Sequence, residues 1–234
     1  MLTEEMKELY EGYYEQEVEQ KRTLSARDSF HEIKKVTRGQ TYEHLLDVGT
    51  GDGAVIQEID DSSFVKKISA VEISNSGIQA TEKRNLKKLV DIKAFDGYEI
   101  PYPDNSFDIA MAIYVLEHVE HERMFLREIA RVANELVISI PLEHTFRIRR
   151  ARMAGKAIGH VNYYTLETFR NILETSGLEV VNLHPYTTSR EYEVFVSGKK
   201  GIVKQLIRST LLSISPRLAC NSLTYHAIAH CKKK

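Results

Sequence analysis

The stretch that decides the fold is Leu45-Leu46-Asp47-Val48-Gly49-Thr50-Gly51-Asp52-Gly53, a short apolar strand that runs into three glycines at alternate positions. A chain that leaves a buried parallel strand and turns into a helix needs residues without Cβ where the backbone reverses, and glycine also lets a ligand approach the main chain. The helix predicted from Ala54 to about Ile59 would then present free N–H groups to an anionic part of that ligand. The stretch therefore predicts a ligand that lies across the turn.

The glycines alone do not choose the cofactor, because Gly49-x-Gly51-x-x-Ala54 also fits the dinucleotide fingerprint. Asp47 helps to choose. A carboxylate two residues before the first glycine would repel a pyrophosphate but hold an ammonium group. S-adenosylmethionine has such an ammonium group and a cationic sulfonium, so Asp47 favours it.

Length and composition indicate one large α/β domain, since 234 residues can bury a full core. The net charge of −1 gives no global basic field, and we expect no nucleic-acid partner. Cys220 and Cys231 are expected to be reduced structural thiols, as in a cytoplasmic protein. The polar, acidic start does not indicate a signal peptide, and no stretch approaches the roughly 20 apolar residues of a membrane span.

Hydrophobic periodicity predicts a helical N-terminal cap over residues 1–40 and then alternating strands and helices over residues 41–234. The predicted strands are 45–49, 68–73, 90–95, 107–114, 136–140 ended by Pro141, 178–183 and 223–230. The predicted helices are 54–59, 76–89, 122–133, 166–176 ended by Gly177, and 202–214. This alternation predicts a Rossmann-like, doubly wound, mostly parallel sheet with ligands outside the carboxyl ends of the strands. Helix 202–214 is expected to face the core or a second copy of the chain, with a membrane surface as the alternative.

Acidic residues follow two of these strands. Glu72 comes nineteen positions after Gly53, close to the spacing at which a carboxylate binds the ribose hydroxyls of a nucleoside. Asp96-Gly97 ends the next strand, where the carboxylate is expected to meet an adenine amino group.

Residues 142–164 interrupt the rhythm and are expected to form a substrate lid. Five basic residues and no acidic one lie between Thr145 and Lys156, which favours an anionic acceptor contacted by Arg149 and Arg152. A solvated basic helix is the alternative. His160 is the predicted general base, with His118 as its main rival. The further substrate and catalytic candidates are Tyr14, which would close over the ligand, and Tyr163 and Tyr164, which would orient the base or the acceptor.

The chain resembles the class I S-adenosylmethionine-dependent methyltransferases, in the small-molecule (methyltransferase type 11-like) branch. The resemblance covers residues 45 to 183 and rests on four segments: Asp47-x-Gly49-x-Gly51-x-Gly53, Val71 to Ser74, Pro101 to Asp108, and Val115 to Val119. The chain departs from the pattern at residues 131–136, where many relatives have a Pro-Gly-Gly turn. The resemblance implies a seven-stranded sheet whose last strand is antiparallel.

The resemblance also implies roles for single residues. Asp47, Gly49 and Gly51 would face the methionine part of the cofactor, Glu72 the ribose, Asp96 the adenine, and Tyr114 to His118 the wall near the sulfonium. The remaining cofactor-binding positions would be Thr50, Gly53, Ile73, Gly97 and Glu117.

The expected function is methyl transfer from S-adenosylmethionine to a small molecule. The preferred acceptor is a hydroxyl of an anionic or sugar-type metabolite, phosphorylated or nucleotide-activated, such as a surface-polysaccharide precursor. The alternatives are a lipid or quinone acceptor and a non-catalytic S-adenosylmethionine-binding partner module. A homodimer is compatible with the sequence.

Two rival classes of enzyme fit less well, and no metal site is expected. A nicotinamide-dependent reductase normally uses Tyr-x-x-x-Lys, and no tyrosine here has a lysine four residues on. An amino-base methyltransferase of nucleic acids would need an Asn- or Asp-Pro-Pro-aromatic segment after strand 107–114, which is missing. No metal is expected, because His118 and His121 lie beside glutamates without an evident third ligand.

Overall fold

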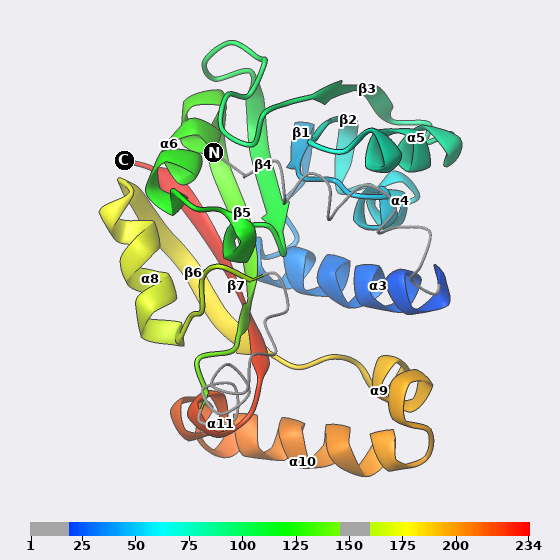
Figure 1. The fold of residues 1–234 in the computed structure, drawn as a ribbon, viewed down its shortest axis with the longest axis vertical. Coiled ribbons are helices and arrows are strands. Elements are labelled where there is room, and N and C mark those ends of the chain that lie inside the picture. The colour runs from blue at the N-terminus through cyan, green and yellow to red at the C-terminus, as the bar shows by residue number, and fades with distance from the viewer. Residues whose placement is uncertain (1–18, 146–159) are drawn as a thin grey trace.

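A computed structural model describes residues 19–145 and 160–234, and a single seven-stranded sheet organises them (Figure 1). The strand order is β3-β2-β1-β4-β5-β7-β6. The strands are β1 (Tyr42–Val48), β2 (Val65–Glu72), β3 (Leu89–Ala94), β4 (Phe107–Ile113), β5 (Ala133–Leu142), β6 (Leu178–Tyr186) and β7 (Tyr225–Lys233). β7 is antiparallel to both β5 and β6, and the other pairs are parallel. The fold predicted from the sequence, a Rossmann-like sheet with an antiparallel last strand, is confirmed.

Helices cover both faces of the sheet (Figure 1). They are α3 (Glu19–Val36), α4 (Ala54–Asp60), α5 (Asn75–Lys83), the short 3₁₀ helix η1 (Leu116–His118), α6 (Glu122–Val132) and α8 (Leu166–Thr175). Leu45 and Ile109 pack with α3 and α4, whereas their neighbours Leu46 and Ala110 pack with α6 and α8. This alternation is the period of two that a doubly covered strand requires.

Several strand ends differ from the sequence-based bounds by up to three residues, and two boundaries differ for a reason that the structure shows. Helix α5 ends at Lys83 rather than near Leu89, because Asn85 adopts a left-handed backbone conformation with φ 51° and the chain then enters β3. Strand β5 also continues through Pro141 to Leu142, so the prediction that Pro141 ends it is wrong. Beyond Ser139 the pairing with β4 is over and only β7 remains a partner, so Pro141 lies where a missing N–H is tolerated.

A helical excursion joins β6 to β7. It consists of α9 (Arg190–Ser197), α10 (Lys200–Ile214) and α11 (Pro216–Ser222), and only the middle helix was predicted from the sequence. Figure 1 shows this excursion set apart from the helices that cover the sheet. Within the described residues, no helix is both long and apolar enough to cross a membrane.

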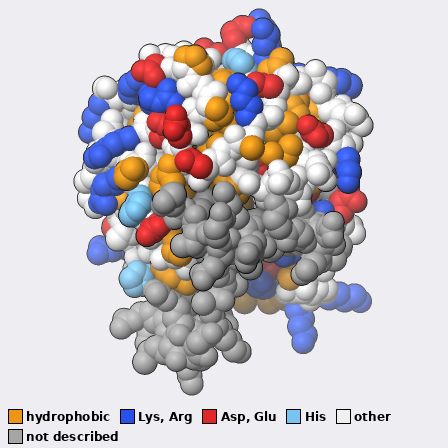
Figure 2. Space-filling view, turned by 45° about the horizontal axis from the view of Figure 1, so that its top comes forward, with side chains coloured by type: hydrophobic (Ala, Val, Ile, Leu, Met, Phe, Trp, Pro, Cys, Tyr) orange, Lys and Arg blue, Asp and Glu red, His pale blue; other side chains and the backbone are white. Residues whose placement is uncertain are grey.

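The described surface carries mixed charge. On the face shown in Figure 2, Lys and Arg side chains are interspersed with Asp and Glu. This distribution agrees with the net charge of −1 and with the absence of a single-sign field in the sequence.

Candidate active site

The turn after β1 is built from glycines with left-handed backbone angles. Gly49, Gly51 and Gly53 have φ values of 75°, 59° and 76°, a region that other residues rarely adopt. A Cβ on Gly49 would lie 2.8 Å from Val115 Cγ2, so the turn passes directly against the segment that follows β4. The predicted role of these glycines, close approach of a ligand to the main chain, stays a prediction, and the structure shows a close approach of Gly49 to Val115.

An ion-pair network holds the same turn in place. Asp52 Oδ2 lies 2.9 Å from Arg22 Nε of α3 and 2.6 Å from Arg84 Nη2. The sequence analysis did not identify these arginines, since neither is near Asp52 in the chain. The network ties helix α3 to the turn, which gives the N-terminal helix a function in ordering the site.

Glu72 closes the turn from the end of β2. One carboxylate oxygen accepts a hydrogen bond of 2.9 Å from Gly51 N–H, and the other accepts from the Ser74 N–H and hydroxyl at 3.1 and 2.8 Å. Glu72 is buried, but it also lines the pocket described below. The carboxylate is therefore fixed in orientation by the turn that it supports.

Asp47 is a buried carboxylate at the mouth of β1, and it is only 3% exposed. Burial, together with the neighbouring Glu72 carboxylate, raises the pKa of Asp47 to about 7. A cation beside Asp47 would reverse this shift. The site is thus suited to the ammonium group that Asp47 was predicted to bind.

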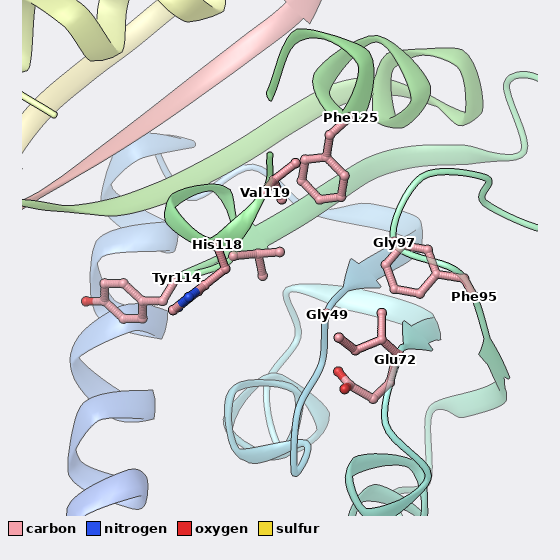
Figure 3. Close-up of a pocket in the computed structure, with 10 residues that line it drawn as sticks. Gly49, Glu72, Phe95, Gly97, Tyr114, His118, Val119 and Phe125 are labelled. Atoms are coloured by element: carbon pink, nitrogen blue, oxygen red, sulfur yellow. The ribbon is translucent and has the colours of Figure 1, made fainter. Parts of the chain in front are cut away.

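A pocket opens over the glycine turn at the carboxyl ends of β1, β2 and β4 (Figure 3). Six residues predicted from the sequence line it: Gly49, Glu72, Ile73, Gly97, Tyr114 and His118. Four apolar residues complete the wall: Phe95, Val115, Val119 and Phe125. Phe95 and Phe125 were missed as pocket residues because apolar side chains in a strand and a helix also suit the core. Asp96 is exposed and accepts hydrogen bonds from the N–H groups of Tyr98 and Glu99, beside Phe95 and Gly97 in the pocket wall.

Tyr114 has a strained backbone, with φ 59° directly after β4. Its hydroxyl lies 2.7 Å from the hydroxyl of Tyr186, whose oxygen is also 3.0 Å from Ser139 Oγ. Figure 3 shows the Tyr114 ring directed away from Glu72, toward α3. The conformation turns the chain into η1 and so positions Glu117 and His118.

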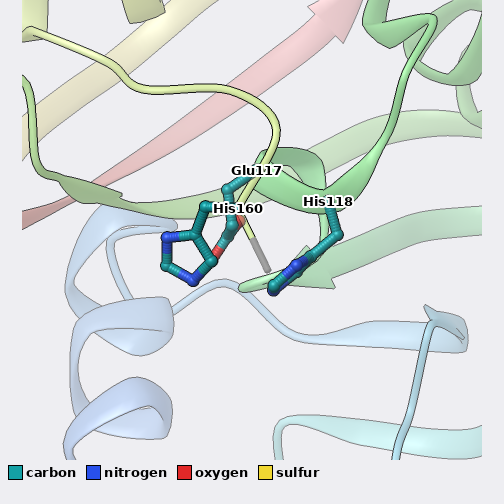
Figure 4. Close-up of side chains that lie close together, drawn as sticks. All are labelled: Glu117, His118 and His160. Atoms are coloured by element: carbon teal, nitrogen blue, oxygen red, sulfur yellow. The ribbon is translucent and has the colours of Figure 1, made fainter. Parts of the chain in front are cut away.

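Glu117, His118 and His160 come together although a long segment separates them in the sequence (Figure 4). One ligand atom of each lies within 4.8 Å of those of the other two, and the rings of His118 and His160 meet edge to face at 4.7 Å between centroids. The sequence analysis found no third ligand for a metal near His118. The structure supplies one in His160, so the geometry would admit an ion, whereas His121 lies outside the group.

Glu143 is the partner of His160 that the sequence analysis missed. Its Oε2 lies 2.5 Å from His160 Nδ1. Burial alone would lower the pKa of His160, but this hydrogen bond and the charge of Glu143 raise the pKa above its ordinary value. The sequence feature that could have identified Glu143 is a carboxylate at the end of a strand, as for Glu72 and Asp96. It was missed because the strand was predicted to end at Pro141, whereas β5 continues to Leu142.

Glu117 is the most deeply buried member of this group. It is 2% exposed, and its Oε2 has no hydrogen-bond partner among the described residues. Burial raises the pKa of Glu117 to about 8. The carboxyl group of Glu117 is therefore protonated at neutral pH and can release its proton at slightly higher pH.

The other predicted residues have different positions. Tyr163 lies near His160, with 6.4 Å between ring centroids. Tyr164 is only 4% exposed and its hydroxyl donates to Glu122 at 2.6 Å, so it is committed to the fold rather than open to a ligand. Thr50 is buried within the glycine turn. Tyr14, Arg149 and Arg152 lie outside the described residues, as does most of the predicted lid.

Comparison with known proteins identifies the family of the chain. A family model described as a methyltransferase domain matches residues 18–183. The chain therefore belongs to the methyltransferase domain family, whose methyl donor is S-adenosylmethionine.

Two curated relatives share part of the chain. The chain is 28% identical to an ajmaline N-methyltransferase from Rauvolfia serpentina over 108 residues, which are 44% of this chain and 37% of that protein. It is 27% identical to the 27-O-demethylrifamycin SV methyltransferase of Amycolatopsis mediterranei over 150 residues, which are 58% of this chain and 54% of that protein. The matched region thus spans about half or less of these relatives' own lengths, and their names differ in the acceptor atom.

A solved structure shows the same fold. The phosphoethanolamine N-methyltransferase of Haemonchus contortus, in complex with S-adenosylhomocysteine, superimposes with a TM-score of 0.59 at 14% identity. The match covers 86% of this chain and 51% of that one. Similarity at this level establishes the architecture alone.

Proposed function

We propose that this protein transfers a methyl group from S-adenosylmethionine to a small-molecule nucleophile. The observation that carries the proposal is a glycine turn that follows the buried carboxylate Asp47 and is hydrogen-bonded to the buried carboxylate of Glu72, with Gly49 and Glu72 lining one pocket. His118 lines the same pocket and lies beside Glu117 and His160, and His160 is hydrogen-bonded to Glu143. Cofactor binding and proton transfer thus occupy adjoining positions.

The residues of the glycine turn fit the proposed cofactor. Asp47 would hold its ammonium group, and the left-handed glycines leave the main chain without Cβ atoms where the ligand approaches. Glu72 would hold the ribose, and the Phe95, Gly97 and Asp96 segment would surround the adenine. Val115, Val119 and Phe125 give the pocket an apolar wall that excludes water. When bound, S-adenosylmethionine supplies an activated methyl group on a cationic sulfur.

His160 is the proposed general base. Its ring is oriented by Glu143 through Nδ1, which leaves Nε2 to take a proton from a hydroxyl or an ammonium acceptor. Glu143 also stabilises the imidazolium that forms. His118, edge to face with His160, and Tyr163 are proposed to position the acceptor.

The proposed acceptor is a hydroxylated metabolite. Its anionic character is supported only by the basic run between Thr145 and Lys156 in the sequence. The described part of the site contributes carboxylates instead, which suits a neutral, hydroxyl-rich acceptor such as a sugar. A lipid or quinone acceptor is the second candidate, favoured by the large exposed apolar side chains of the segment that joins β6 to β7.

A turnover screen tests the proposal. The purified chain is incubated with S-adenosylmethionine and a panel of sugar, nucleotide-sugar and quinol acceptors, and the release of S-adenosylhomocysteine is measured. His160→Ala should lower kcat by about 10²–10⁴ while cofactor affinity stays near that of the wild type. A chelator in a parallel reaction decides between acid–base and metal-assisted activation, since only the second loses turnover. Normal turnover at saturation in His160→Ala would remove His160 from the chemistry.

A further inference from the structure

Helix α10 presents an apolar face to solvent. Only Gly201 is buried in this helix, while a stripe of large apolar residues is between 41% and 75% exposed. The stripe, here called the α10 face, consists of Val203, Leu206, Ile207, Leu211 and Ile214. These positions follow the spacing of one helix side, and Leu212 on the other side packs against the core. The expectation that helix 202–214 faces the core holds for the side that carries Leu212, and the α10 face lies on the opposite side.

The α10 face continues into α11, where Leu218 is 68% exposed. Most of the exposed large apolar side chains in the described part of the chain belong to the excursion α9 to α11. An apolar patch that is confined to one structural unit indicates an interaction surface rather than scattered exposure.

The charged residues around the α10 face indicate which kind of partner it binds. From Gly198 to Ser222 the chain has five basic residues and no acidic one. Lys199 and Lys200 are exposed at the N-terminal end of the face, and at the other end Arg217 is 84% exposed, with its Nε 3.9 Å from Glu167 Oε1. Lys204, at the rim, is 44% exposed and pairs with the buried Glu193 beneath it. Basic residues at both ends of an apolar stripe match an anionic surface.

A second copy of the chain fits this face less well. Two copies joined through α10 would bring Lys199 and Lys200 of both copies to one interface, while the nearby carboxylates Glu193 and Glu167 already pair with Lys204, Arg208 and Arg217. An anionic membrane satisfies both properties, because acyl chains receive the apolar side chains while headgroups pair with the basic residues.

We propose that this protein binds the surface of anionic membranes through the α10 face. The proposal is independent of methyl transfer. The excursion leaves the sheet at the end of β6 and returns at the start of the antiparallel β7, which is the edge that carries the glycine turn and His118. A membrane-bound molecule would consequently hold its cofactor site at the lipid side of the protein.

Co-flotation of the full chain with vesicles tests the proposal. Phosphatidylcholine vesicles that contain about three-tenths phosphatidylglycerol should bind the protein, and pure phosphatidylcholine vesicles should bind it far less. The double variant Leu206→Ser/Ile207→Ser should lose at least about tenfold in vesicle affinity. Lys199→Ala/Lys200→Ala should lose about fivefold per lysine at low salt.

The matched control is Val90→Ser/Met124→Ser, which removes two equally exposed apolar side chains from β3 and α6. It should bind vesicles like the wild type. Light scattering of each variant reports the oligomeric state. Equal binding to neutral and anionic vesicles, no binding to either, or a dimer that only Leu206→Ser/Ile207→Ser dissociates would overturn the proposal.

Discussion

At the scale of single residues, burial of the Asp47 carboxylate lowers the stability of the folded state without cofactor, and we propose that this carboxylate binds the ammonium group of the cofactor. Its folded pKa of about 7 lies above the ordinary value of 3.8, so the folded state holds a proton that the unfolded state releases. The resulting cost is absent below about pH 4 and complete above about pH 7. Asp47→Asn removes this cost while keeping the shape of the side chain.

We therefore predict that Asp47→Asn, without cofactor, is more stable than the wild type at pH 8 by on the order of 2–4 kcal/mol. The difference should shrink toward pH 4. Cofactor affinity should fall in the same variant. Thermal melts across this pH range, with and without S-adenosylhomocysteine, measure both effects. Lower stability at pH 8 without ligand would contradict the assigned role of Asp47.

The contact between His160 and Glu143 leads to a second prediction, which concerns the pH dependence of kcat. The base form of His160 exists above its pKa, and Glu143 holds this pKa above the ordinary 6.5. Glu143→Gln removes the carboxylate charge that raises the pKa of His160. The rise of kcat with pH on the acid side of the profile, the acid limb, should therefore move to lower pH, and the maximal kcat should drop. The acid limb belongs jointly to Glu117 and His160, because the charge of each shifts the pKa of the other. An unmoved acid limb in Glu143→Gln would exclude this coupling.

Residue-level prediction from the sequence was most successful where backbone geometry constrains side chains. Gly49, Glu72 and Gly97 follow or end predicted strands, and they line one pocket because parallel strands bring their carboxyl ends to one edge of the sheet. Glu143 and Arg84 were not identified, since their partners are far away in the sequence and only tertiary packing brings them together. Tyr164 has the same residue type and neighbourhood as Tyr163, yet packing places it in the core.

At the scale of elements, the excursion α9 to α11 depends on close contact between two helices. A Cβ on Gly201 of α10 would lie 2.0 Å from the carbonyl oxygen of Glu193 in α9. Glu193 is buried and pairs with Lys204 at 2.7 Å and Arg208 at 3.4 Å, which joins the helices electrostatically. Backbone atoms cannot move aside as a flexible side chain can.

Gly201→Ala should therefore push α9 and α10 apart and destabilise the excursion by about 1–3 kcal/mol. Limited proteolysis should then cut residues 190–222 faster than in the wild type, while cofactor binding at the other elements persists. Ser213→Ala, on the exposed side of α10, is the control and should resist like the wild type. Unchanged cleavage in Gly201→Ala would show that the helices tolerate the extra atom.

The elements themselves were predicted unevenly for a physical reason. Amphipathic α6 and α8 have strong helical periodicity, and the β-strands read as apolar runs. Helices α9 and α11 are short, and their ends are fixed by the Ser189 and Ser215 caps rather than by a long apolar pattern. Pro141 led to a wrong prediction of the end of β5, because a strand tolerates proline where one neighbouring strand is missing, and the sequence does not show where the pairing with β4 ends.

At the scale of the whole molecule, sheet topology links the cofactor turn, the His160 group and the excursion. All three lie at the edge where β1, β2, β4, β5 and β6 end. Helix α3 reaches the same edge through the ion pair of Arg22 with Asp52. The doubly wound sheet could be anticipated from the alternation of strands and helices, and its antiparallel last strand from the family resemblance. The composition of the acceptor side could not, because it combines segments from both halves of the chain.

Direct titration of the purified chain with S-adenosylhomocysteine tests the central claim, that the glycine turn and its carboxylates form the cofactor site. The wild type should bind at one site per chain, and NAD should not compete. Glu72→Ala and Gly51→Val should abolish or greatly weaken binding. Ser74→Ala should bind nearly as well as the wild type, because it removes one hydrogen bond to Glu72 but keeps the carboxylate. Unchanged affinity in Glu72→Ala and Gly51→Val, or tighter binding of NAD than of S-adenosylhomocysteine, would contradict the account.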